Sequence, residues 1–228
     1  MSFSPLGRFD PNVTIDRKLI DKALEFGRTL PRPPAAAMHG LNRIYAHWTV
    51  SACNCDFTDY NGETKLDAAS GLYTFRLEHN PLDEIPGLNN DPEIAGTWHR
   101  NTGSIACAIT GMDAATENDF GPDAVTVAGL QNLCAMMAAF ARVYFIGPRG
   151  RVAGGSTHLD NNGNSVNTRG EWNLLTHGEV AVIDAYPSER WDLGSFVPLP
   201  SGEQLTPAMR SQCGDALRTL TERILFKL

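Results

Sequence analysis

Two histidines and an aspartate, distant in the sequence, are the residue types of a zinc site. His177 lies in the segment 176–181 and Asp192 in the segment 190–194, close enough for one loop to fold both side chains onto one ion. His47, far upstream in the segment 44–50, offers a second imidazole. Two imidazoles and a carboxylate suffice to hold a catalytic zinc, with the fourth position left to water. The alternative interpretation is that both histidines are buried core residues whose ring nitrogens are satisfied by hydrogen bonds. Glu179 is interpreted as a structural salt-bridge partner rather than as a catalytic base.

The composition indicates a soluble protein. The chain has 228 residues, enough for one large domain, and a formal net charge of −7, which argues against a nucleic-acid binder. The sequence contains no run of about 18 apolar residues, so no stable membrane insertion is expected. The N-terminus has no basic start followed by an apolar run, so synthesis in the cytoplasm without an export signal is expected.

The five cysteines are odd in number and irregularly spaced, which is typical of reduced thiols rather than a disulfide framework. Cys53 and Cys55 could form a second metal site, but incidental thiols are the preferred interpretation. The pair Met136 and Met137 is interpreted as core filling.

Three helices and four strands must position these residues. Helical periodicity predicts helices over 16–26, with an extension to 30 as the alternative, over 126–145 and from 206 to about 228. Strands are predicted over 41–50, 72–78, 104–111 and 174–177. The strand over 41–50 would be buried on both faces and would carry His47 near its C-terminal end, where open sheets place their sites.

The remaining segments are predicted as loops. They comprise a surface arm over 1–14, loops over 51–70, 81–95 and 147–172, and a linker over 195–204. We expect residues 1–40 to be an arm and helix that pack on a single domain formed by residues 41–228, which includes the C-terminal helix.

Four blocks in order resemble one family. They are the apolar run from Ile44 to His47 and Thr49, the segment Tyr73-Thr74-Phe75, the segment 101–111, and the segments around His177 and Asp192. Together they resemble the zinc-dependent N-acetylmuramoyl-L-alanine amidases of the type-2 amidase fold, which includes phage endolysins and peptidoglycan recognition proteins. The resemblance covers residues 44–194.

The resemblance implies an α/β fold, with a central mixed sheet flanked by helices. It implies zinc held by His47, His177 and Asp192, and hydrolysis of the amide between N-acetylmuramic acid and L-alanine of the peptidoglycan stem peptide. Amide hydrolysis at neutral pH needs an activated water and a polarised carbonyl, and a zinc with an open position supplies both. Because the loop before Asp192 is longer than in compact members, Asp184 is the alternative third ligand.

This chain departs from the family pattern in ways that affect the catalytic assignment. It has Ala106 where the family usually has Gly, and Ala108 where some members have a Glu. Tyr73, resembling the tyrosine of the second-strand block, is therefore our candidate for positioning the water. Arg190 stands where the family often has Lys, and it could stabilise the developing oxyanion or instead pair with a carboxylate.

The expected partner is peptidoglycan or a muropeptide, bound by a monomer. The residues assigned to substrate binding are Thr49, Trp98, His99 and Asn101. Trp172 and Trp191 could stack on sugar rings, although core packing is the default for tryptophan. A phage or prophage endolysin would act on the cell wall, in the periplasm. The alternatives are a non-catalytic peptidoglycan-binding module and a cytoplasmic amidase that recycles muropeptides.

Overall fold

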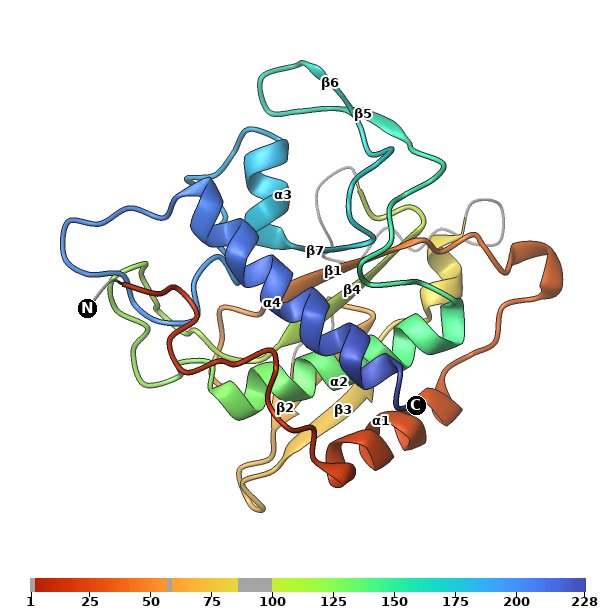
Figure 1. Ribbon diagram of the computed structural model, residues 1–228, viewed down its shortest axis with the longest axis horizontal. Helices are drawn as coiled ribbons and strands as arrows, with labels where there is room; N and C mark the ends of the chain where they lie inside the picture. Colours follow the sequence, from red (N-terminus) through yellow and green to blue (C-terminus); the bar gives the residue numbers. More distant parts are fainter. Residues whose placement is uncertain (1–2, 57–58, 86–99) are drawn as a thin grey trace.

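A computed structural model describes residues 3–56, 59–85 and 100–228, and it shows a five-stranded mixed sheet flanked by helices (Figure 1). The strand order is β3-β2-β4-β1-β7, and only β3 runs antiparallel to its neighbour. The α/β fold in a single domain agrees with the expectation. The strands of the sheet are β1 (Arg43–Trp48), β2 (Gly62–Leu66), β3 (Tyr73–Leu77), β4 (Ser104–Ile109) and β7 (Leu174–Thr176).

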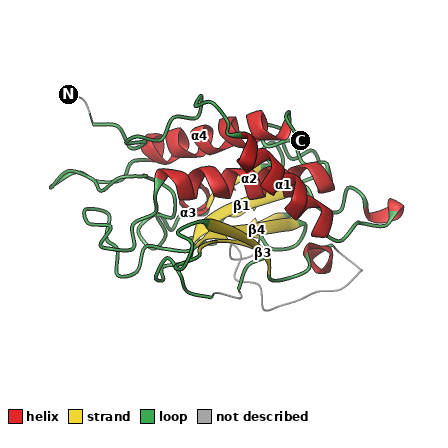
Figure 2. Ribbon diagram, turned by 90° about the horizontal axis from the view of Figure 1, so that it is seen from below, coloured by secondary structure: helices red, strands yellow, loops and turns green. Residues whose placement is uncertain are grey.

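The long helices gather on one face of this sheet. Figure 2 shows α1, α2 and α4 above the strands, whereas loops dominate the other side. The helices are α1 (Arg17–Thr29), α2 (Val127–Tyr144), α3 (His177–Ile183) and α4 (Pro207–Leu225), with short 3-10 turns η1 (Ala35–Ala37) and η2 (Pro81–Glu84). No helix within the described ranges is long and apolar enough to cross a membrane.

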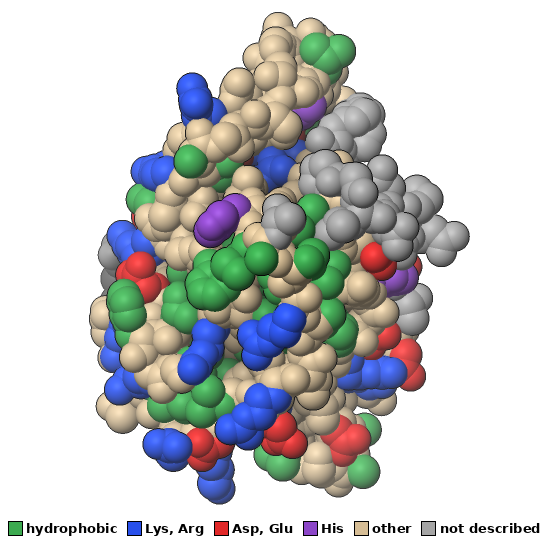
Figure 3. All heavy atoms as spheres, turned by 90° about the vertical axis from the view of Figure 1, so that its right-hand side faces the viewer, with side chains coloured by type: hydrophobic (Ala, Val, Ile, Leu, Met, Phe, Trp, Pro, Cys, Tyr) green, Lys and Arg blue, Asp and Glu red, His purple; other side chains and the backbone are tan. Residues whose placement is uncertain are grey.

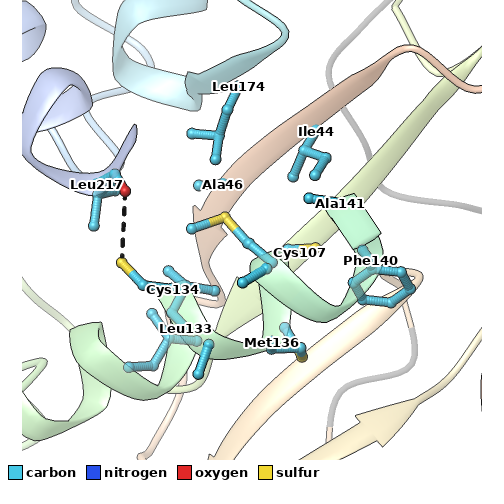
Figure 4. Close-up of a cluster of buried hydrophobic side chains, with 14 of the residues drawn as sticks. Ile44, Ala46, Cys107, Leu133, Cys134, Met136, Phe140, Ala141, Leu174 and Leu217 are labelled. Atoms are coloured by element: carbon cyan, nitrogen blue, oxygen red, sulfur yellow. Dashed lines mark hydrogen bonds between the residues drawn. The ribbon is translucent and has the colours of Figure 1, made fainter. Parts of the chain in front are cut away.

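The main core lies between the sheet and α2. Ile44 and Ala46 of β1 point toward α2, and Met136 and Phe140 of α2 are completely buried there (Figure 4). The thiol of Cys134 donates to the Leu217 carbonyl of α4 at 3.8 Å, so α4 closes the layer from outside. The prediction that Met136 and Met137 fill the core is confirmed, since both are completely buried.

The surface of the molecule that Figure 3 shows carries Lys and Arg side chains among exposed hydrophobic ones.

Local capping chemistry explains where the helices begin and end. Thr126 caps α2 and Thr206 caps α4, each by accepting from a backbone N–H in the first turn, and Pro207 occupies the first turn of α4. Helix α1 continues past Gly27 to Thr29, which confirms the longer alternative, because Gly27 packs against Ala139 of α2 instead of ending the helix.

Three loop predictions need correction. Strand β2 lies within the segment 51–70, which was predicted as a loop. The strand was not predicted because its sequence, Gly-Glu-Thr-Lys-Leu, lacks an apolar alternation, but it pairs with a neighbouring strand on both sides. The excursion over 147–172 contains a hairpin formed by β5 (Thr157–Leu159) and β6 (Ser165–Asn167). The arm over 1–14 is more than a surface segment, since Phe9 is buried and its ring packs edge-on against Phe196 at 5.1 Å.

Candidate metal centre

His47 faces the side of the sheet opposite α2. Alternate residues of a strand point to opposite faces, and its neighbours Ala46 and Trp48 belong to the core on the α2 side. Tyr45, on the same face as His47, packs instead against Leu175 of β7 and Val180 of α3. The His47 side chain is 1% exposed, and it lies near the C-terminal end of β1, as predicted.

His177 lies beside His47 because of a sharp strand-to-helix transition. β7 pairs in parallel with β1, with Ala46 opposite Thr176, so His177 follows at the same edge of the sheet. Thr176 caps α3 in a capping box with Glu179, and His177 is the first residue of that helix. Glu179 also forms a buried ion pair with Arg218 at 2.8 Å. The structure therefore confirms Glu179 as a salt-bridge partner, although helix α3 itself was not predicted.

Asp192 joins the two histidines through the loop that follows α3. The Gly178 N–H donates to the Asp192 carbonyl at 2.9 Å, which ties the two ligand-bearing segments together. A side chain at Gly178 would meet that carbonyl oxygen, with a Cβ at 2.9 Å, so only glycine permits this approach.

The donor atoms of the three side chains converge on one point. Nδ1 of His177 lies 3.1 Å from Nδ1 of His47 and 3.2 Å from Oδ2 of Asp192, and the third distance, from His47 Nδ1 to Asp192 Oδ2, is 3.7 Å. Ligand atoms arranged tetrahedrally around zinc are roughly 3.3–3.5 Å apart, given zinc–ligand bonds of about 2.0–2.2 Å. The buried group of His47, His177 and Asp192 could therefore hold a metal ion with little rearrangement.

The charge states of the metal-free site suit a cation. Burial lowers the pKa of His47 to about 4, so its ring is neutral at neutral pH. Burial alone would raise the pKa of Asp192, but its interactions with the adjacent His177 and His47 rings outweigh burial and hold that pKa well below its usual range. A neutral imidazole and an ionised carboxylate are the forms that bind metal, because protons compete for the same atoms.

A cavity of about 510 Å³ opens onto this cluster. Its wall includes the cavity-lining residues Trp48, Thr49, Val50, Asp59, Tyr60, Met112, Ala115, Glu189, Arg190 and Trp191 in addition to the three proposed ligands. Because the three donor side chains line this cavity, a metal ion held by them would have room for a further ligand on the cavity side.

The structure corrects the assignment of Tyr73. Its hydroxyl hydrogen-bonds the Thr126 hydroxyl at 2.8 Å, and it lies against Gly129 of α2, so the side chain is on the α2 face. Its strand β3 is the outer strand, separated from β1 by β2 and β4. Tyr73 is thus on the wrong face, three strands away from His47, and the prediction that it faces the metal is wrong.

Tyr60 occupies the place that was expected for Tyr73. Its ring lies 5.2 Å from the His47 ring, packs on Ala106 and Ala108, and lines the cavity. Sequence reasoning missed it because the segment 51–70 was interpreted as a loop. The available signal was an aromatic residue in a polar stretch just before Gly62, where β2 begins.

Glu63 is a second missed residue on this face. Gly62 and Thr64 face Phe140 and Met136 of α2, so Glu63 between them points to the opposite side. Glu63 pairs with Ala108, which in turn pairs with His47, so the three residues form one row across the sheet. Tyr60 packs against Ala108 on this row, and Glu63 is completely buried.

Arg190 lies where the sequence predicted it. Its exposed side chain lines the cavity, and its positive charge is near enough to lower the pKa of His47, after the larger effect of burial. The hydrogen bond described for it is from its Nη1 to the Glu189 carbonyl at 3.2 Å. Within the described ranges no carboxylate forms an ion pair with Arg190, so the structure gives no support to the pairing alternative.

The predicted substrate residues divide into three groups. Thr49 lines the cavity, and its hydroxyl contacts the Ser51 hydroxyl at 2.5 Å. Asn101 precedes β4 at the N-terminal edge of the sheet, away from the edge that carries the ligands, and does not line this cavity. Its backbone carbonyl accepts from Ser104 there, so the expected contact with substrate beside the metal needs correction. Trp98 and His99 lie outside the described residues.

The other residues considered as metal ligands, Asp184, Cys53 and Cys55, are not part of the cluster of His47, His177 and Asp192. Asp184, the alternative third ligand, pairs with the Arg100 guanidinium at 2.6 Å and with His158 at 3.0 Å. Cys53 is half-buried against Asp123, where burial raises the pKa of its thiol to about 11, and Cys55 is exposed. Within the described part of the chain, no other cluster of three potential ligands was found.

Comparisons with known proteins add no assignment. No family model, no curated protein and no solved structure matches this chain.

Proposed function

We propose that this chain is a zinc-dependent N-acetylmuramoyl-L-alanine amidase that degrades the cell wall, of the kind that phages and prophages use as endolysins. The observation that supports the proposal is the convergence of two imidazoles and one carboxylate at the bottom of an open cavity. This donor set suits zinc, and in catalytic sites a set of three protein ligands leaves one position for water or substrate.

The residues around the cluster have the chemistry that amide hydrolysis needs. Zinc bound by His47, His177 and Asp192 would polarise the amide carbonyl and lower the pKa of a nearby water. Arg190 is permanently charged and faces the same cavity, so it can stabilise negative charge that develops on the carbonyl oxygen. Burial raises the pKa of Tyr60, so its hydroxyl keeps its proton and acts as a hydrogen-bond donor.

The amide between N-acetylmuramic acid and L-alanine is proposed as the scissile bond because of the four sequence blocks that resemble amidases of this class. The cavity also offers a surface for a sugar ring. Trp191 lines it and is held edge-on against Trp48, with ring centroids 4.6 Å apart. An aromatic side chain fixed in this way can present its exposed part to a ligand.

Mass spectrometry of digested peptidoglycan tests the proposal most directly, because it reports which bond is cut. We expect release of stem peptides with a free L-alanine amine, together with about one zinc per chain by elemental analysis. Purified peptidoglycan and soluble muropeptides are tested side by side, since cleavage of muropeptides alone would assign the chain to recycling. Wall binding without cleavage by the zinc-loaded chain would assign it to recognition instead and would refute the amidase.

A further inference from the structure

A buried arginine of the C-terminal helix contacts both segments that carry the proposed ligands. Arg210 lies in the first part of α4 and is 2% exposed. Its Nη1 donates to the Gly178 carbonyl at 3.1 Å and to the Arg190 carbonyl at 2.7 Å, and its Nη2 donates to the Pro187 carbonyl at 2.7 Å. Gly178 directly follows His177, and Arg190 precedes Asp192 by two residues.

These contacts distinguish Arg210 from Arg100 and Arg218, two other buried arginines. Arg100 pairs with Asp184 and Glu171, and Arg218 pairs with Glu179 and Asp215. Within the described ranges no ion pair forms at Arg210, and burial lowers its pKa. A buried cation without a carboxylate is unfavourable unless other groups satisfy it, and here three backbone carbonyls accept from its Nη1 and Nη2, while its buried Nε has no partner in the described part of the chain.

Hydrogen bonds of Arg210 and Gly178 connect the start of α3 with the loop that carries Arg190 and Asp192. The Gly178 N–H holds the Asp192 carbonyl, while the Gly178 carbonyl and the Arg190 carbonyl are both held by Arg210. The Arg210 side chain also packs on Gly194, where a Cβ would lie 3.1 Å from Arg210 Cγ. The loop from Pro187 to Gly194 contains no regular secondary structure, so its path depends on contacts of this kind.

We propose that Arg210 is a positioning residue that clamps the start of α3 to the loop carrying Arg190 and Asp192, and so preorganises the metal centre. The inference rests on the metal site of the proposed function. It does not depend on which bond the site cleaves. A ligand held within a fraction of an ångström of its working position by a second layer of contacts binds its metal with less loss of entropy.

Arg223 supplies a matched control on the same helix. Its Nη1 also donates to two backbone carbonyls, of Pro11 and, at 3.0 Å, of Val13, but these belong to the N-terminal arm and not to the metal centre. Arg210→Met and Arg223→Met each remove an arginine that holds a carbonyl-bearing segment against α4. General loosening of α4 would affect both variants, whereas a specific clamp affects only the first.

The experiment compares zinc affinity and amide hydrogen exchange in the full-length chain. We expect Arg210→Met to weaken zinc binding at least tenfold and to speed exchange of the Gly178 amide at least tenfold beyond the change in global unfolding. Arg223→Met should leave both unchanged after the same correction, and Arg210→Lys should recover part of the zinc affinity. If Arg210→Met does not fold, Arg210→Lys, with fewer donors, is compared with Arg223→Lys instead.

Two outcomes separate this inference from the proposed function. Equal changes in the variants of Arg210 and Arg223 would overturn the clamp, even in a chain that binds zinc and cleaves the wall. A chain that binds no zinc would refute the proposed function, yet the exchange rate of the Gly178 amide would still decide whether Arg210 holds the two segments together.

Discussion

Two buried clusters in this protein combine histidine with carboxylate, and they balance charge differently. In the first, His47 and His177 surround Asp192, and both ion pairs of Asp192 in the described ranges involve those histidines. In the second, Asp184 meets His158 and also the guanidinium of Arg100. The second carboxylate therefore has a guanidinium as an ion-pair partner, whereas the first forms ion pairs with imidazoles alone in the described ranges and can accept an external cation.

The surroundings of the two clusters agree with this difference. The cluster of Asp192 opens onto a cavity of about 510 Å³, whereas Arg100 of the other cluster is enclosed and also pairs with Glu171 at 2.6 Å. A guanidinium that satisfies two carboxylates leaves no role for a metal ion. Of the two similar groups of residues, we therefore assign metal binding to the one in which no arginine forms an ion pair with the carboxylate, within the described ranges.

Removal of a proposed ligand should have the largest effect. His177→Ala should abolish zinc binding and hydrolysis together, because two remaining donors hold zinc weakly, and Asp192→Asn should do nearly the same. Zinc titration and a wall-digestion assay measure the two losses. Either variant with full zinc affinity would remove that residue from the ligand set.

The convergence of His47, His177 and Asp192 was predicted from the sequence, whereas their surroundings were not. His47 lies near the end of β1, His177 directly follows β7 and Asp192 lies in the loop after α3, and the resemblance of four sequence blocks to one family, rather than spacing, selected them. The face on which a strand residue lies depends on the pleat, and a shift of one residue reverses it. Tyr73 was expected at the metal from the resemblance of its block to the family, but its side chain points toward α2 and its strand lies three strands from β1.

Strand β2 and helix α3 were missed for related physical reasons. Glu63 and Lys65 make β2 look like a polar loop, because its stability comes from pairing with β3 and β4 and not from an apolar pattern. Helix α3 is only seven residues long, too short for a helical period to be visible. Its capping box, Thr176 with Glu179, was the one local signal of its start.

Loss of the cavity cation should have the second largest effect. Arg190→Ala should lower turnover roughly 10²-fold while zinc binding stays normal, as the loss of an oxyanion donor does in other enzymes. Arg190→Lys should recover much of the rate. A change confined to the Michaelis constant would show that Arg190 binds substrate uniformly and takes no special part in the transition state.

The two tyrosines give a smaller and more specific test. Tyr60→Phe should lower turnover roughly tenfold with zinc affinity unchanged, because the Tyr60 ring lies 5.2 Å from the His47 ring and the residue lines the cavity. Tyr73→Phe should leave turnover unchanged and lower only stability, by about 1 kcal/mol for the lost hydrogen bond to Thr126. The reverse result would return Tyr73 to the catalytic role.

The smallest effect on the metal centre is expected from the second cluster, where the main effect is on stability. Asp184→Asn removes one of the two carboxylates that pair with the buried Arg100 guanidinium; loss of a buried partner costs about 3–5 kcal/mol where the charge is left uncompensated, and less is expected here because Glu171 still pairs with Arg100. Urea unfolding measures that loss, and zinc titration of the folded variant should give an affinity within about twofold of the parent. Because Asp184 is the alternative third ligand, a large loss of zinc affinity without a loss of stability would exchange the roles of the two aspartates. It would also show that an arginine that pairs with the carboxylate of a histidine–carboxylate cluster does not prevent metal binding.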